Sequence, residues 1–459
     1  MFHSHSHRNI EMTEGSLWRN TILFALPLLA SGILQLLFNA ADTIVVGRFS
    51  GQRALAAVGS VGSLTSLIVN LFMGLSTGTN VVVAQFIGAK DHSNTRRAVH
   101  TAVTVSVIGG AALGLIGFIL ARPILTWMDS PADVIDLSVL YVRIIFLGLP
   151  VQMLYNFSAA ILRAVGDTKR PLYFLTAAGV INVLLNLFFV IALKMSVAGV
   201  ALATVLSQAV SATLVVRSLI LREDWVHLEL KKLGINPRIL GKIAKIGLPS
   251  GIQGSMFSIS NVLIQSSVNS FGTIAMAGNA AAANICSFVH QGVQSIAQTV
   301  TAFVGQNMGA RKPRRILRVM GVCQVWNLLF TGILGAGSYI LGEKLLALYN
   351  TNPEVIRLGM ERMLLVNVPY FILGIYDVFS GALRGIGYSL LPMFIALMGI
   401  CALRIGWVTF VFHANPSFNT LFWSYPVSWS ATAVVMGLAF CILFRRTKRQ
   451  FSPLELAAE

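Results

Sequence analysis

Long apolar stretches recur along the whole chain, and they restrict its fold more than any other feature. About twelve of them follow one another between Leu17 and Phe444, separated by charged or turn-forming residues. A helix needs about 20 apolar residues to cross a bilayer, and in lipid the backbone must satisfy its hydrogen bonds internally. We therefore predict an all-α membrane protein with twelve transmembrane helices, at residues 17–46, 54–83, 95–120, 134–161, 171–193, 196–220, 238–270, 277–305, 315–341, 354–383, 389–412 and 420–444.

The charge distribution supports a membrane protein and gives its orientation. Only 11% of the 459 residues are charged, against about 25% in soluble proteins, which excludes an ordinary soluble enzyme. The net charge of +17 would suggest nucleic acid in a soluble protein, but 25 of the 34 Lys and Arg fall in one set of loops and seven in the other. Cytoplasmic loops carry such an excess. We predict that both termini are cytoplasmic and that no nucleic acid is bound.

The chain contains an internal repeat. LRAVGDTKRP (162–171) matches LRGIGYSLLP (383–392), and QFIGAK (85–90) matches QNMGAR (306–311), both at an offset of 221 residues. Each repeat holds six predicted spans, so both halves enter the membrane in the same direction. We expect two six-helix lobes related by a pseudo-twofold axis along the membrane normal. The predicted units are a polar tail (1–15), an N-lobe (16–222), a cytoplasmic linker (223–237), a C-lobe (238–445) and a second tail (446–459).

Of the 17 acidic residues, only Asp42 and Asp377 fall well inside predicted spans. Intramembrane acids are costly and mark functional sites. Helical rise places Asp42, Asn182, Asn186 and Thr204 in the outer half of the first lobe. Their oxygens suit a hard cation, or Asp42 holds a proton. The two Asn side chains, four residues apart on one helix face, also suit plain interhelical hydrogen bonding.

The second lobe offers a different pair. Asp377 and Arg404 lie on neighbouring predicted spans, where they form either a structural ion pair or part of a cargo site. We place them with Gln35 and Asn39 of the first span as candidate residues of a substrate cavity. The four Cys are widely separated, and no nucleotide-binding or metalloprotease motif occurs. We expect no enzyme activity, no metal site and no cofactor.

Several strings resemble the multidrug and toxic compound extrusion (MATE) family: FALPLLASGILQLLFNAADTIVVGRFSG (24–51), ALAAVG (54–59), AQFIGAKD (84–91) and VAGVALAT (197–204), together with both LRxxG turns. The resemblance implies two lobes forming a V, alternating access, and export of cationic or amphipathic compounds driven by H⁺ or Na⁺. It also implies a monomer among the lipids of a bacterial cytoplasmic membrane.

The family's first-lobe cation site is matched by Asp42, Asn182 and Thr204. Asn186 departs from the family pattern, which has Asp there, and this weakens the case for Na⁺. The second-lobe Glu of some members has no counterpart between Arg238 and Ser270. Asp377 is the acid that remains in that lobe.

Two alternatives remain open from the sequence. A lipid-linked oligosaccharide flippase shares the general architecture and would scramble a labelled lipid-linked sugar. A channel needs no coupling acid and would show a ring or filter motif. Exchange of drug for a cation would exclude a channel.

The charge asymmetry gives the first testable prediction. A reporter fused after Gln450 should report a cytoplasmic C-terminus, because the loops joined to that end carry most of the Lys and Arg. An external reporter signal would contradict the predicted topology.

Overall fold

The computed structural model describes residues 9–128 and 134–451, and every regular element in these ranges is a helix. Within them, nine helices are long and apolar enough to cross a membrane, or ten if one bent pair counts as a single span. Two further helices, α9 and α10, have 33 and 37 residues but carry more Ser, Asn and Gln. The all-α membrane fold is confirmed. The predicted total of twelve spans stays a prediction.

The first half of the chain follows the predicted spans closely. The predicted span 54–83 is broken at Val61 into two helices, and the span 134–161 bends by 46° at Gly148. Pro150 next to this glycine lacks the N–H needed to continue the preceding helix. The elements are α1 (Leu17–Phe49), α2 (Gly51–Ser60), α3 (Gly62–Gly88), α4 (His92–Trp127), α5 (Ile135–Leu147), α6 (Leu149–Val165), α7 (Lys169–Asn186), the π-helix η1 (Leu187–Ala192) and α8 (Ser196–Ile220).

The second half repeats this order after a linker that contains the short 3₁₀ helix η2 (Leu230–Lys232). Its elements are α9 (Pro237–Asn269), α10 (Thr273–Gly309), α11 (Pro313–Ile340), α12 (Gly342–Ala347), α13 (Pro353–Val366), α14 (Tyr370–Ile386), α15 (Leu390–Ala396), η3 (Leu397–Ala402), α16 (Leu403–Gly406), η4 (Trp407–Phe412) and α17 (Phe418–Lys448).

The repeat is visible in the backbone conformation as well as in the sequence. Gly166 and Gly387, 221 residues apart, both end their helices in the left-handed region, with φ of 98° and 112°. Glycine is favoured at this position because a Cβ would be strained there. Lys90 and Arg311, again 221 apart, both have φ of 56°. Equivalent loops of the two halves therefore share the same unusual turns.

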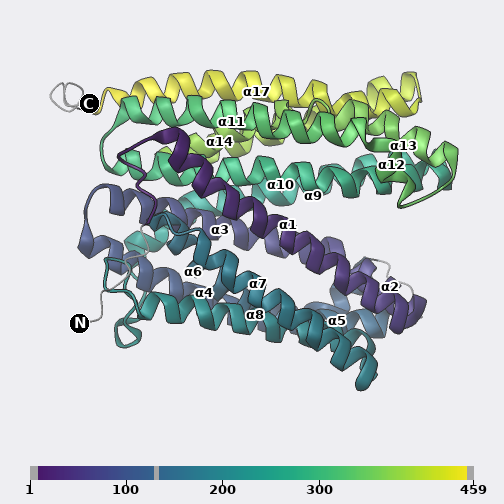
Figure 1. The fold of residues 1–459 in the computed structure, drawn as a ribbon, viewed down its shortest axis with the longest axis horizontal. Helices are drawn as coiled ribbons and strands as arrows, with labels where there is room; N and C mark the ends of the chain where they lie inside the picture. Colours follow the sequence, from purple (N-terminus) through teal and green to yellow (C-terminus); the bar gives the residue numbers. More distant parts are fainter. Residues whose placement is uncertain (1–8, 129–133, 452–459) are drawn as a thin grey trace.

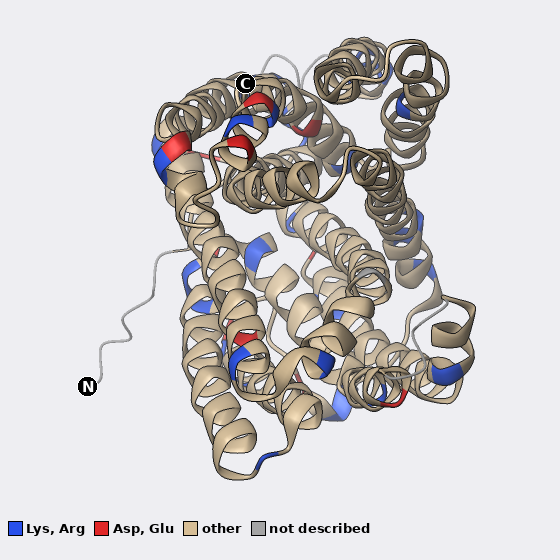
Figure 2. Ribbon diagram, turned by 90° about the vertical axis from the view of Figure 1, so that its right-hand side faces the viewer, with Lys and Arg blue, Asp and Glu red and all other residues tan. Residues whose placement is uncertain are grey.

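The helices form two groups that run roughly parallel to one another. In Figure 1, α4, α6, α7 and α8 lie in the lower group and α10, α11, α14 and α17 in the upper one, with α1 crossing between them. The start of α1 and the end of α17 lie at the same end of the molecule. We call this the inner end, because it carries the basic loops. Seen along the helices in Figure 2, most of the ribbon carries no charge.

The first helix of each half packs its inner part against the core of the other half. Phe24 of α1 is fully buried beside Phe303 of α10, with ring centroids 5.5 Å apart. Ile239 and Ile243 of α9 are buried in the core formed by α3, α4 and α6. The predicted lobes are therefore interleaved at their inner ends.

Residues 9–15, predicted as part of a polar tail, form an ordered segment across the inner end. Met12 is 1% exposed, and its carbonyl accepts a hydrogen bond from Asn307 of α10 at 3.0 Å. The Ile10 amide donates to the Gly166 carbonyl at 3.3 Å. This N-terminal segment thus bridges the two halves. The remaining tail residues, 1–8 and 452–459, lie outside the described residues.

The start of α4 gives a prediction about stability. Asp91 caps this helix by accepting a hydrogen bond from the Asn94 amide at 3.0 Å and another from the Asn94 side chain at 2.6 Å. These bonds lower the pKa of Asp91 below its ordinary value of 3.8. Asp91→Ala should lower the free energy of unfolding by about 1 kcal/mol, measured by denaturant unfolding in detergent.

Asp91→Asn is the control, because an Asn side chain caps nearly as well and does not titrate. The lowered pKa means that the contribution of the ionised Asp91 is complete above 3.8 and is lost as the pH falls below it. The wild type should therefore lose stability relative to Asp91→Asn in acid. A constant difference across this pH range would contradict the assignment.

Candidate functional site

A large cavity lies between the two halves of the molecule. Its volume is about 950 Å³, and residues of α1, α3, α6, α7, α8, α9, α10 and α14 line it. This volume is at the upper end of the range for small-molecule sites, about 300–1,000 Å³. Both intramembrane acids predicted from the sequence, Asp42 and Asp377, belong to its lining.

Asp42 is joined to the two asparagines of α7 by direct contacts. The Asn186 side-chain amide donates a hydrogen bond to the Asp42 carboxyl, and it also donates to the Asn182 side-chain oxygen at 3.2 Å. Asn182 and Asn186 are buried at 5% and 0% exposure. The i, i+4 spacing brings both onto one helix face. The predicted neighbours of Asp42 on α7 are therefore placed where the sequence argument put them.

Two further groups complete the surroundings of Asp42. Thr204 of α8 lies within hydrogen-bonding reach of the carboxyl and also donates to the Val200 carbonyl at 2.9 Å. Tyr141 of α5 interacts electrostatically with Asp42 and lines the cavity. The sequence reasoning did not assign Tyr141. Its position facing Asp42 depends on the packing of α5, which no motif announces.

One polar atom beside Asp42 has no partner. The Asn186 side-chain oxygen is buried and makes no hydrogen bond to a described residue. A buried acceptor without a donor is costly. Three oxygens, from the carboxyl, Asn182 and Asn186, therefore lie in one small region, and the π-helix η1 begins directly after Asn186. Single-turn π segments are common at functional sites.

The wall formed by α1 continues from Asp42 toward the inner end. Gln35, Asn39 and Asp42 follow at helical spacing, and all three line the cavity. Gln35 and Asn39 are exposed to it. These two predicted substrate-cavity residues are placed on its surface.

The predicted ion pair between Asp377 and Arg404 is wrong. Their charged atoms are not within 4 Å of each other, and Arg404 does not line the cavity. Arg404 is 4% exposed and donates to the Ser428 hydroxyl at 3.2 Å. Its guanidinium lies 4.1 Å from the centre of the Tyr425 ring, where a cation–π interaction stabilises it. The aromatic face of α17, rather than the acid on α14, holds this charge.

The opposite wall carries polar residues that the sequence analysis left unassigned. His290, Gln291 and Gln294 of α10 line the cavity, and the Tyr370 hydroxyl lies 3.0 Å from the His290 Nδ1. Arg163 and Arg384, identified in the sequence only as marks of the repeat, also line it. Each lies seven residues after another lining residue, Asn156 or Asp377, and this spacing was the available signal.

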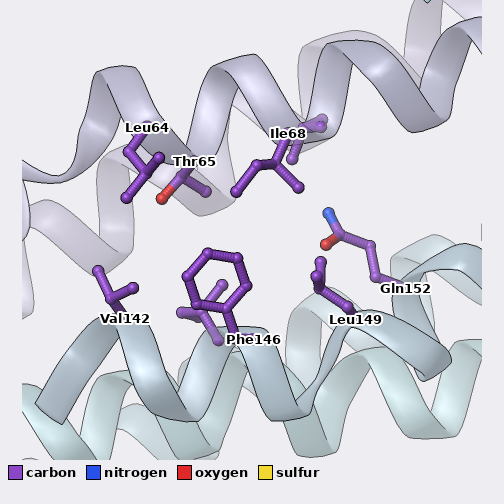
Figure 3. A pocket seen from close by; sticks show the side chains of 9 residues that line it. Leu64, Thr65, Ile68, Val142, Phe146, Leu149 and Gln152 are labelled. Atoms are coloured by element: carbon purple, nitrogen blue, oxygen red, sulfur yellow. The ribbon is translucent and has the colours of Figure 1, made fainter. Parts of the chain in front are cut away.

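A second pocket is much smaller and apolar. Leu64 and Ile68 of α3 face Phe146 and Leu149 of α5 and α6 across it, and Gln152 lies at one side (Figure 3). Its volume of about 10 Å³ is roughly that of one water molecule. The larger cavity is therefore the candidate site. No group of three or more His, Cys, Asp or Glu in the described ranges is placed to hold a metal ion.

The chain matches the family model described as MatE over residues 27–188 and 249–407. It is similar to the probable multidrug resistance protein YoeA of Bacillus subtilis, with 29% identity over 399 residues, covering 85% of this chain and 86% of that protein. It is also similar to the FAD transporter of Shewanella oneidensis, with 24% identity, covering 81% and 82%. A solved outward-facing multidrug resistance transporter shares the fold, with a TM-score of 0.90, 20% identity, and coverage of 97% and 100%.

The separation of Asp377 from Arg404 gives a prediction about their energetic coupling. The stability losses of Asp377→Asn and Arg404→Gln should add in the double variant to within about 0.5 kcal/mol, as for residues that share no contact. Denaturant unfolding of the four proteins in detergent measures the difference.

Arg222 and Asp167 are the matched positive control. Their charged atoms are 3.3 Å apart and their side chains 8% and 9% exposed. This pair should show a coupling energy of about 0.5–3 kcal/mol. Equal coupling in both cycles would mean that Asp377 and Arg404 interact after all.

Proposed function

The chain belongs to the MATE family of membrane transporters, and on this premise we propose that it exports amphipathic or cationic organic compounds across a bacterial cytoplasmic membrane in exchange for H⁺. The names of its relatives support drug export, as with YoeA, and also include a FAD transporter. The cargo therefore need not be a simple cation.

The observation that carries the proposal is the isolated carboxyl of Asp42 in the wall of a cavity of cargo size. A single intramembrane acid that reaches an aqueous cavity is the usual element of a proton-coupled carrier. The Asn186 amide donates to this carboxyl, which suits the ionised form. On protonation, a rotated Asn186 amide would accept a bond from the new O–H through the oxygen that now lacks a partner.

This exchange of hydrogen-bond roles links proton loading to helix packing. Asp42 is on α1, Asn182 and Asn186 are on α7, and Thr204 is on α8, so a change at the carboxyl acts on three helices. Loading a proton removes the negative charge that attracts a cationic group of the cargo. Cargo then leaves outward, and the loaded carrier returns inward to discharge. H⁺ is preferred over Na⁺ because Asn186 supplies an amide where a second carboxylate would strengthen a Na⁺ site.

The orientation and span number form part of the same proposal. Twelve spans with both termini cytoplasmic place Asp42 toward the outside and the N-terminal segment at the cytoplasmic end. The contacts of Met12 and Ile10 at the inner end correspond to a carrier closed toward the cytoplasm. One monomer among membrane lipids, without cofactor, suffices for this cycle.

Asp42→Asn tests the coupling step. This variant should fold and reach the membrane but should lose at least about tenfold in export driven by an imposed pH gradient, because its side chain cannot load or release a proton. Dye export from proteoliposomes, with the pH gradient and a Na⁺ gradient imposed separately, measures the effect. Wild-type export by Asp42→Asn under the pH gradient would overturn the proposal.

Two variants separate the titrating group from its neighbours. Asn182→Ala leaves the carboxyl in place and should reduce coupling less than Asp42→Asn. Asn186→Asp adds a second carboxylate and should raise the response to Na⁺. If wild-type export follows the Na⁺ gradient alone, the coupling ion is Na⁺ and not H⁺.

A further inference from the structure

Two arginines occupy equivalent positions at the inner end of the cavity. Arg163 of α6 and Arg384 of α14 are 221 residues apart, and each precedes by three residues the left-handed glycine that ends its helix. Both are half-buried, and both line the cavity. The acid Asp42 lies toward the other end, near the outer end of α1.

A reciprocal set of backbone contacts holds the two arginine positions on either side of one helix crossing. Gln306 of α10 donates to the Ala164 carbonyl at 2.6 Å, and Gln85 of α3 donates to the Gly385 carbonyl at 2.8 Å. Each accepting carbonyl belongs to the residue directly after an arginine. The inner ends of α3 and α10 touch at this point, so close that a Cβ on Gly88 would lie 1.9 Å from the Gln306 carbonyl oxygen.

Neither guanidinium is neutralised by a carboxylate. Within the described part of the chain, Arg163 makes no side-chain hydrogen bond or ion pair, and Arg384 makes one bond, to the Ser380 carbonyl of its own helix at 3.3 Å. Asp377 acts on Arg384 electrostatically from two helical turns away, without an ion pair within 4 Å. Its counterpart in the first half is Asn156, which carries no charge and also lines the cavity.

The inner end of the cavity therefore carries a net positive charge, with guanidinium donors free to bind. Unpaired charge at membrane depth is costly, and an Arg fork fits the two oxygens of a carboxylate or phosphate. Arg163, which has no acid on its own helix turn, has the larger unmet demand.

We propose that Arg163 and Arg384 bind an anionic group of the cargo, so that the transported compounds include amphipathic molecules bearing a carboxylate or phosphate. This inference rests on the proposed transport function, and it specifies the cargo. The acid group of the cargo binds at the inner end, and its apolar or cationic part extends toward α1 and Asp42. A small molecule in the cavity, rather than a membrane lipid, is the ligand in this proposal.

The test compares a carboxyl-bearing xanthene dye with its own ethyl ester, which differ only in the acid group. Binding to the purified full chain is followed by fluorescence polarisation in a neutral detergent, with and without added anionic lipid. The wild type should bind the acid about tenfold more tightly than the ester, the equivalent of about 1.4 kcal/mol. Arg163→Gln and Arg384→Gln should each reduce or abolish this preference and leave ester binding unchanged.

Arg217→Gln is the control variant, because Arg217 is an exposed arginine near the same end that does not line the cavity. It should bind both dyes as the wild type does. Two separate arginine variants, each checked for a monodisperse elution profile, keep the test valid if one of them misfolds.

The remaining outcomes are distinct. An acid preference that persists in both cavity variants, or is absent from the wild type, overturns the inference. If anionic lipid displaces acid and ester dyes alike, the arginines bind lipid headgroups and the inference is also wrong. If the acid preference depends on both arginines but no gradient drives dye export, the binding site stands and the proposed transport function fails.

Discussion

The two halves of the chain are held together by a contact in which helix backbones touch without side chains between them. Gly74 and Gly78 of α3 face Gly247 and Gly251 of α9, and both pairs have the spacing of close-packed membrane helices. A Cβ on Gly74 would lie 2.1 Å from the Gly251 nitrogen, and one on Gly78 would lie 2.3 Å from the Ile243 carbonyl oxygen. Because α9 belongs by sequence to the second half, this α3–α9 contact fixes how the halves meet and so where a cavity can form.

The equivalent contact, between α1 and α10, is built differently. The repeat places Ser295 and Thr299 of α10 where α3 has its two glycines, and the Pro27–Pro249 correspondence places Ala25 and Leu29 of α1 where α9 has its own. These larger side chains keep α1 from approaching α10 as closely. The polar face of α1 with Gln35, Asn39 and Asp42 therefore lines open space. One glycine-sealed contact and one wider contact together produce a cavity that is asymmetric although the chain is repeated.

The sequence predicted the features that depend on local pattern. Apolar length gave the helices, the offset of 221 predicted matching turns at Gly166 and Gly387, and i, i+4 spacing predicted the Asn182–Asn186 face beside Asp42. It failed for Arg404, because helical depth does not say which neighbour a long side chain reaches, and the aromatic rings of α17 were closer than Asp377. It also failed to foresee the packing of Met12, whose partners lie about 300 residues away in the chain.

The difference between the two contacts bears on why such a protein is a single chain. Two identical half-chains assembled about a symmetry axis would have two identical contacts, both sealed or both wide. Duplication within one gene removes that constraint, because each copy can lose or gain glycines independently. The α3–α9 contact closes one flank of the cavity against the bilayer, while the α1–α10 flank keeps a gap that acyl chains or a lipid-dissolved compound can approach. Fusion of the halves thus gives the molecule a single lateral door.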